Sequence, residues 1–133
     1  MHHGGAVFKS KEFARFARKA ALSDVELCRA VSEIHAGTVD ADLGGGVYKQ
    51  RVRRSGGGKS GGFRTIILIR LREIAIFVDG FSKSDRSNIS KDELFAFRSI
   101  AKNLLFSSAA VAGAIKDGKL IEVMCEESET ISQ

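Results

Sequence analysis

The stretch Phe63-Arg64-Thr65-Ile66-Ile67-Leu68-Ile69-Arg70-Leu71 decides the fold of this chain. It is a short and nearly continuous run of Ile and Leu, which is typical of a strand that is buried on both faces. The run therefore predicts the central strand of a sheet.

The segments on either side of this run also have the two-residue period of strands. Along residues 47–54, basic side chains alternate with uncharged ones, and residues 74–81 are rich in β-branched and aromatic types. Three consecutive strands of this kind predict an antiparallel meander. Shorter strands are expected over residues 6–8, 38–43 and 120–124.

Two helices are predicted before the meander. Ser10 can cap a helix that runs to about Ala20, and the capping box Ser23-x-x-Glu26 opens a second helix that Gly37 ends. Because the turn between them is short, the two helices are expected to form an antiparallel hairpin.

After the meander, the capping box Ser90-x-x-Glu93 opens a C-terminal helix, and a shorter helix is expected over residues 108–116. The outline is a single α+β domain over residues 1–125, in which the helices, including the N-terminal hairpin, pack on one side of a small, mainly antiparallel sheet. The polar and acidic residues 126–133 predict a disordered tail.

Cys28 and Cys125 are far apart in the chain and have neither metal-binding nor redox spacing. They are expected to be unpaired thiols of a reduced, cytoplasmic protein. No apolar run approaches the ~20 residues of a membrane-spanning helix, so no membrane segment is expected.

Positive charge is concentrated in residues 49–72. This segment holds eight Lys and Arg residues and no Asp or Glu, so it accounts for the whole net charge of +5. A local field of this sign attracts phosphate groups. The basic residues of the segment are Lys49, Arg51, Arg53, Arg54, Lys59, Arg64, Arg70 and Arg72.

The glycine-rich turn at residues 55–62 contains Gly58-Lys59-Ser60, which invites comparison with a nucleotide-binding phosphate loop. That motif requires a glycine where this chain has Arg53, and a helix after the loop. A strand is expected there instead. The turn is therefore interpreted as a flexible hairpin loop that carries Lys59.

Lys49, Arg51 and Arg53 alternate along one predicted strand and so share one face, which Arg64 on the next strand is expected to join. Three such charges alone are most often an ordinary solvated face. The lack of any carboxylate in the segment favours a site for a polyanion instead.

Residues at the end of the third strand extend this prediction. Lys83 and Arg86 either reach the rim of the site or belong to a plain charged loop, and Phe81 is either a core residue or a platform for a stacked base. Arg70 and Arg72, at the far end of their strand, are interpreted as bystanders. No His, Asp or Glu cluster has metal-ligand spacing, so neither a metal nor another cofactor is expected.

Four segments carry a resemblance to a known family, namely Tyr48-Lys49-Gln50-Arg51-Val52-Arg53, Gly58-Lys59-Ser60-Gly61-Gly62, Phe63-Arg64 and Phe77-Val78-x-Gly80-Phe81-x-Lys83. Over roughly residues 5–105, the chain resembles the RelE/HigB toxins of bacterial type II toxin–antitoxin systems. The resemblance implies a helical hairpin on a small curved sheet. It also implies an endoribonuclease that cuts mRNA on the ribosome, and a cognate antitoxin, of the helix-turn-helix type, that masks it.

Together with the resemblance, the residues define a predicted site. Its catalytic residues are Lys49, Arg51, Arg53 and Arg64. Its RNA-binding residues are Lys59, Phe81, Lys83 and Arg86. Ser84 and Ser90 stand where the best-studied members of the family have an arginine and a tyrosine.

These residues suit attack of the RNA 2′-hydroxyl on its adjacent phosphate, which requires no metal. Arginines can stabilise the charge that builds on the phosphate oxygens, but they stay protonated and cannot act as a base. Lys49 is the predicted general base, because neighbouring positive charges favour a neutral amine.

Two other functions fit the same sequence. One is a non-catalytic toxin of the ParE type, which inhibits a target protein such as DNA gyrase. The other is a simple RNA-binding module that uses the same basic patch.

Overall fold

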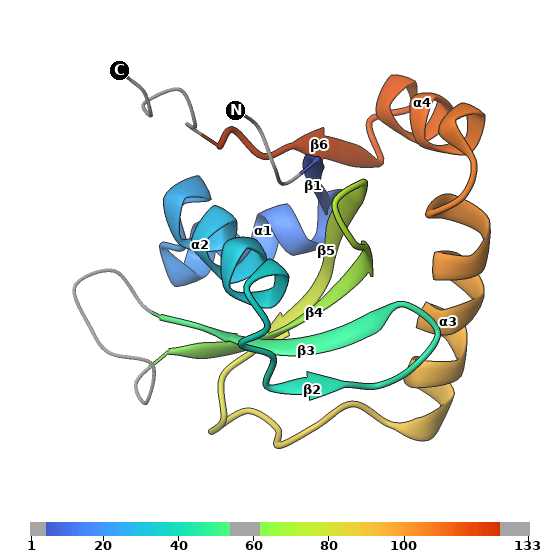
Figure 1. Ribbon diagram of the computed structural model, residues 1–133. Coiled ribbons are helices and arrows are strands. Elements are labelled where there is room, and N and C mark those ends of the chain that lie inside the picture. The colour runs from blue at the N-terminus through green and yellow to red at the C-terminus, as the bar shows by residue number, and fades with distance from the viewer. Residues whose placement is uncertain (1–4, 54–61, 126–133) are drawn as a thin grey trace.

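The fold is built on one six-stranded sheet with helices around it (Figure 1). The structure is a computed structural model that describes residues 5–53 and 62–125. The strands are β1 (Ala6–Ser10), β2 (Ala41–Asp42), β3 (Val47–Val52), β4 (Phe63–Arg70), β5 (Ile74–Phe81) and β6 (Leu120–Glu122). The helices are α1 (Lys11–Ala20), α2 (Asp24–His35), α3 (Lys91–Leu104) and α4 (Ser108–Lys116). Lys59 and the predicted tail at 126–133 lie outside the described residues.

The order of strands in the sheet is β2-β3-β4-β5-β1-β6. Strands β3, β4 and β5 form the predicted antiparallel meander. Strand β1 joins β5 in parallel, and β6 pairs antiparallel with β1 at the edge. The sheet is therefore mixed, with one parallel pair among antiparallel neighbours.

Strand β4 is buried on both faces, as its sequence predicts. Residues 65–69 are all buried, and the apolar ones alternate between two separate hydrophobic clusters. Ile67 and Ile69 belong to the cluster that contains residues of α1 and α2. Ile66 and Leu68 belong to the cluster that contains residues of α3 and α4.

Helices lie on both sides of the sheet, so the expectation that they pack on one side was wrong (Figure 1). On one face, Phe13 of α1 and Leu27 of α2 are buried. On the other, Ala101 of α3 and Leu105 just after it are buried. The reason is that a strand with apolar side chains on both faces needs apolar cover on both. The α+β class is confirmed.

The two N-terminal helices begin as predicted. The Ser10 hydroxyl accepts the Phe13 N–H at 3.0 Å, and Ser23 and Glu26 form a capping box. After α1, Ala21 adopts a left-handed φ of 56°, which turns the chain. The predicted hairpin is inexact, because α1 packs on β5 whereas α2 packs on β3. The helices thus cover different strands of one face.

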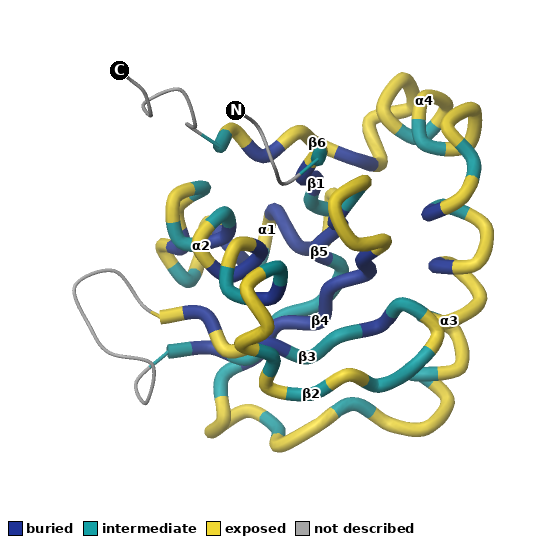
Figure 2. The backbone as a smooth tube through the Cα atoms, in the orientation of Figure 1, coloured by how far each residue is buried: buried dark blue, intermediate teal, exposed yellow. Residues whose placement is uncertain are grey.

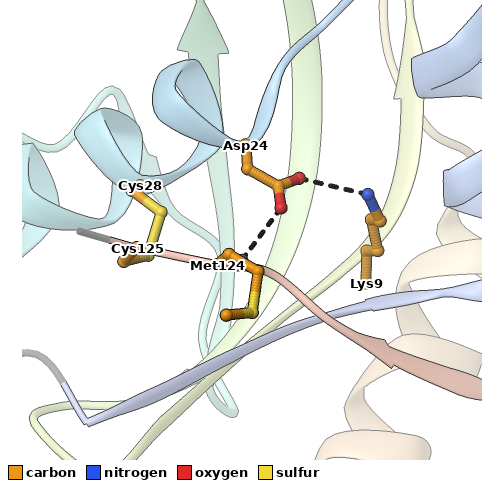
Figure 3. Close-up of a disulfide and its surroundings, with 5 residues drawn as sticks. All are labelled: Lys9, Asp24, Cys28, Met124 and Cys125. Carbon is orange, nitrogen blue, oxygen red and sulfur yellow. Dashed lines mark hydrogen bonds and ion pairs between the residues drawn. A yellow bond between two sulfur atoms is a disulfide. The ribbon is translucent and has the colours of Figure 1, made fainter.

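A disulfide joins Cys28 to Cys125, so the expectation of two unpaired thiols was wrong (Figure 3). The two residues are 97 positions apart in the sequence, but their Cα atoms are 5.7 Å apart. Asp24 lies one helical turn before Cys28. Its carboxylate accepts the Met124 N–H at 2.9 Å and pairs with Lys9 Nζ at 3.2 Å. Helix α2 therefore holds the segment after β6 by a covalent bond and a hydrogen bond.

Reduction of the disulfide should lower the free energy of unfolding by up to about 4 kcal/mol, because a bond that closes a long loop restricts the unfolded chain. Chemical denaturation with and without dithiothreitol measures this change. A variant with both Cys28→Ser and Cys125→Ser is the control. Its midpoint should match that of the reduced wild type and should not respond to dithiothreitol. A wild-type midpoint that is the same with and without reductant would contradict this expectation.

Candidate functional site

The predicted basic residues of β3 and β4 lie on the face of the sheet toward α3. Arg51 is the register partner of Arg64, and Lys49 is the partner of Ile66, which belongs to the cluster on the α3 side. Paired residues point to the same face, as do residues two apart along a strand. Lys49, Arg51 and Arg64 therefore share this face. Arg53 follows β3 and lines a small cavity with Glu26 and Glu33 of α2, so the structure does not place it with the other three.

Gln50, buried on the opposite face of β3, positions a carboxylate beside Arg51. Its side chain accepts the Asp40 N–H at 2.9 Å and donates to the Thr38 carbonyl at 2.8 Å. Asp40 Oδ2 accepts the Arg51 N–H at 2.6 Å and lies 3.7 Å from Arg51 Nε. Residues 49–72 contain no carboxylate, but Asp40, from outside this segment, thus lies beside Arg51. Arg64, by contrast, forms no ion pair with any residue that the structure describes.

A β-bulge in β5 brings an acidic residue to the same face. Asp79 pairs with Ile66, whereas the neighbouring pair joins Ile67 to Phe77, so Val78 is an extra residue between them. The shift turns Asp79 toward the basic face of the sheet.

Asp79 is not among the site residues predicted from the sequence, because strict alternation along β5 would put it on the same face as Phe77. The isolated glycine that follows it is the signal that could have indicated a bulge. A Cβ atom at Gly80 would lie 2.4 Å from the ring of Phe16 in α1. Glycine is therefore required here for α1 to approach the strand.

Arg86 ties the segment after β5 to both the sheet and α3. Its Nη1 lies 3.0 Å from each carboxylate oxygen of Glu93, and its Nη2 lies 2.5 Å from Asp79 Oδ2. The guanidinium also lies over the Phe81 ring, 4.5 Å from its centroid. Arg86 is thus occupied by two carboxylates and a ring. Phe81 is only 3% exposed and offers no free face for a base.

The two carboxylates that hold Arg86 have pKa values shifted in opposite directions. Burial raises the pKa of Asp79 above its ordinary value, although Arg86 opposes the shift. The pKa of Glu93 is lowered, because the Ser90 N–H and Arg86 both donate to its ionised form. Arg86 thus favours the ionised form of both carboxylates, and burial outweighs this effect at Asp79.

The segment between β5 and α3 also reaches back to β3. Asn88 Oδ1 accepts a hydrogen bond from Lys49 Nζ at 3.3 Å. Ser90 caps α3, because its hydroxyl accepts the Glu93 N–H at 3.1 Å. Lys83 is exposed in this segment. The segment thus presents an amide oxygen to Lys49 and carries an exposed cation.

Arg70 and Arg72 lie at the far end of β4, as predicted. The Arg70 guanidinium is 4.9 Å from the centroid of the Phe106 ring, and the Arg72 N–H donates to His35 Nε2 at 3.2 Å. Neither contact joins these arginines to the basic face near Arg64.

Over residues 5–53 and 62–125, no group of three or more His, Cys, Asp or Glu side chains could hold a metal ion. In the same ranges, no helix has both the length and the apolar character needed to cross a membrane.

A mixed sheet with one cationic face and helices on both sides defines a small α+β protein that is suited to anionic ligands. A protein-family model described as "RelE toxin of RelE / RelB toxin-antitoxin system" matches residues 6–123. The chain belongs to this RelE toxin family, and the resemblance found in the sequence is confirmed. It is the toxin of a toxin–antitoxin system, which implies a cognate antitoxin. No curated protein matches the chain.

Glu93→Gln should destabilise the protein near neutral pH, because the amide is a weaker partner for Arg86 and for the helix cap. The folded-state pKa of Glu93 is below its ordinary value, so its stabilising effect is present above the ordinary pKa and is lost as the pH falls through the folded one. The difference in unfolding free energy between wild type and variant should therefore shrink between neutral pH and about pH 3.

Chemical denaturation at several pH values measures this difference. Glu122→Gln, which changes an exposed carboxylate on β6, is the matched control and should have little effect at any pH. A Glu93→Gln effect of the same size at both ends of the pH range would show that the carboxylate charge is not what stabilises the segment.

Proposed function

We propose that this toxin is an endoribonuclease that cuts mRNA on the ribosome, in the cytoplasm, without a metal or another cofactor. Residues 1–125 would form the toxin domain. The observation that supports the proposal best is the cross-strand pair of Arg51 and Arg64, with Lys49 on the same face.

Two arginines directly opposite each other on neighbouring strands repel, because the strands are only about 4.8 Å apart. Among the described residues, Arg64 has no carboxylate to offset this repulsion. A phosphate between the two guanidinium groups would relieve it and would accept hydrogen bonds from both forks. The pair therefore favours binding of a phosphodiester.

In the proposed reaction, the 2′-oxygen of the RNA attacks the adjacent phosphorus, and the bond from phosphorus to the 5′-oxygen breaks. The products are a 2′,3′-cyclic phosphate and a 5′-hydroxyl, whose oxygen takes up a proton from water. Negative charge develops on the non-bridging oxygens in the transition state. Arg51, Arg53 and Arg64 would stabilise this charge electrostatically.

Lys49 is proposed as the general base that accepts the 2′-hydroxyl proton. The neighbouring arginines cannot take this role, because they stay protonated. Asn88 Oδ1 lies 3.3 Å from Lys49 Nζ. A neutral amine that donates one hydrogen to Asn88 keeps its lone pair for the substrate. Ser90 is engaged in capping α3 and is not the proposed base.

The remaining predicted residues are given two kinds of role. Lys59 and Lys83 are proposed to contact phosphates of the RNA backbone. Arg86 and Phe81 are proposed to act indirectly, since they hold the segment that carries Lys83 and Asn88.

Arg64→Ala should reduce RNA cleavage at least about a hundredfold, because loss of one donor to a transition-state oxyanion costs 10²–10³ in rate. Cleavage in cells is measured by mapping mRNA 5′ ends after induced expression of either the wild type or the variant. Arg18→Ala, which removes an exposed arginine of α1, is the matched control and should cleave like wild type. Growth arrest by the wild type while cellular mRNA stays intact would contradict the proposal and favour a toxin that only inhibits its target.

Lys49→Met should abolish cleavage, since it removes the proposed base, and should leave the salt dependence of RNA binding nearly unchanged, because a neutral amine neutralises no phosphate. Single-turnover cleavage and RNA binding by the purified variant, both in EDTA, separate the two effects. Cleavage by a folded Lys49→Met protein at the wild-type rate would exclude Lys49 as the base. Weaker binding alone would leave the residue as a phosphate contact.

A further inference from the structure

The disulfide between Cys28 and Cys125 lies at the margin of the core. Both cysteines are only partly buried, and they pack against the hydrophobic cluster that contains residues of α1 and α2. Figure 2 shows buried and exposed residues mixed along α2, as expected of a helix with one face on the sheet. We therefore expect a dissolved thiol to reach the sulfur atoms while the protein stays folded.

The segment that carries Cys125 is short and lies at the edge of the sheet. Strand β6 has three residues and pairs with β1. Beyond β6, the Val123 N–H donates to the Val7 carbonyl at 2.8 Å, and the Met124 N–H donates to Asp24 of α2 at 2.9 Å. Reduction of the disulfide would remove the covalent link between α2 and this segment and leave noncovalent contacts in its place.

Helix α2 connects the disulfide to the basic strand β3. Arg29, the residue after Cys28, lines a small cavity between α2 and β3. On the strand side, Arg51 and Arg53 line the same cavity. The chain then continues from α2 to Asp40, whose carboxylate lies 3.7 Å from Arg51 Nε. Helix α2 and the segment after it thus form part of the surroundings of Arg51.

Helix α2 is attached at both of its ends. In its first half, the disulfide and Asp24 join it to the segment after β6. After its last residue, the Thr38 carbonyl and the Asp40 N–H bind the side chain of Gln50, which is buried in β3. Packed helices can slide as units when a contact at one end changes. Loss of the first attachment can therefore change how α2 lies against β3.

We propose that the Cys28–Cys125 disulfide is a redox switch that acts through α2 on the basic face formed by Lys49, Arg51 and Arg64. The oxidised protein binds RNA more tightly, because a fixed α2 holds the surroundings of Arg51 in place before RNA arrives. The inference rests on the proposed function, including its location in the cytoplasm. Disulfides of cytoplasmic proteins are usually transient and redox-sensing, because thiols are kept reduced there.

The reducing partner is a dithiol. It supplies two electrons and two protons, the bond between the two sulfur atoms breaks, and both cysteines become thiols. The dithiol closes to its own disulfide in the same exchange.

The test measures binding of a single-stranded RNA whose 2′-hydroxyls are methylated, and which therefore cannot be cleaved, by fluorescence anisotropy. Reduction of the wild type with dithiothreitol should weaken binding at least about fivefold, the lower end of the coupling between two sites. The variant with both Cys28→Ser and Cys125→Ser should bind like the reduced wild type, with or without dithiothreitol. Leu120→Ala removes a buried side chain of β6 but keeps the disulfide, so it is the control for lost stability and should bind like the oxidised wild type. Thermal unfolding shows that each protein is folded at the assay temperature.

Three results would overturn the proposal. One is equal RNA affinity of the oxidised and reduced wild type. Another is a disulfide that dithiothreitol reduces only in the unfolded protein, as measured by thiol alkylation and mass spectrometry. The third is amide hydrogen exchange in α2 that stays the same on reduction. This last measurement requires no RNA, so it tests the switch separately from the proposed function, which an oxidised protein that neither binds nor cleaves RNA would contradict.

Discussion

The burial of β4 on both faces is the constraint on which the rest of the structure depends. Its apolar side chains point alternately into two hydrophobic clusters, so each face of the sheet requires a layer of helices. The N-terminal helices cover one face closely. The C-terminal helices cover the other only in part, since α3 has a single buried residue. This incomplete layer leaves the basic face accessible.

The face toward α3 changes from apolar to cationic along the strands. Val47 and Leu68 are paired and fully buried at one end, whereas Arg51 and Arg64 are paired at the other. The apolar pair and the charged pair belong to the same two strands, β3 and β4. The strands that build the core therefore also position the charges. Rigid elements of this kind hold side chains more precisely than loops do.

Carboxylates from distant parts of the chain limit the repulsion among these charges. Asp40 lies beside Arg51, and Asp79 and Glu93 hold Arg86. None of the three belongs to the basic segment that the sequence displays. Among the described residues, Arg64 is left without such a carboxylate. An external phosphate would therefore offset a charge that the protein itself leaves unpaired there.

Sequence alone determined the strands of the meander, the helix caps at Ser10, Ser23 and Ser90, and the shared face of Lys49 and Arg51, because these features follow from the local period of the chain. Only the tertiary structure decided the Cys28–Cys125 disulfide, the bulge that turns Asp79, the partners of Arg86 and the placement of helices on both faces. The physical reason is that each of these depends on contacts between residues far apart in the sequence, for which local propensity and spacing carry little signal beyond the isolated Gly80 at the bulge.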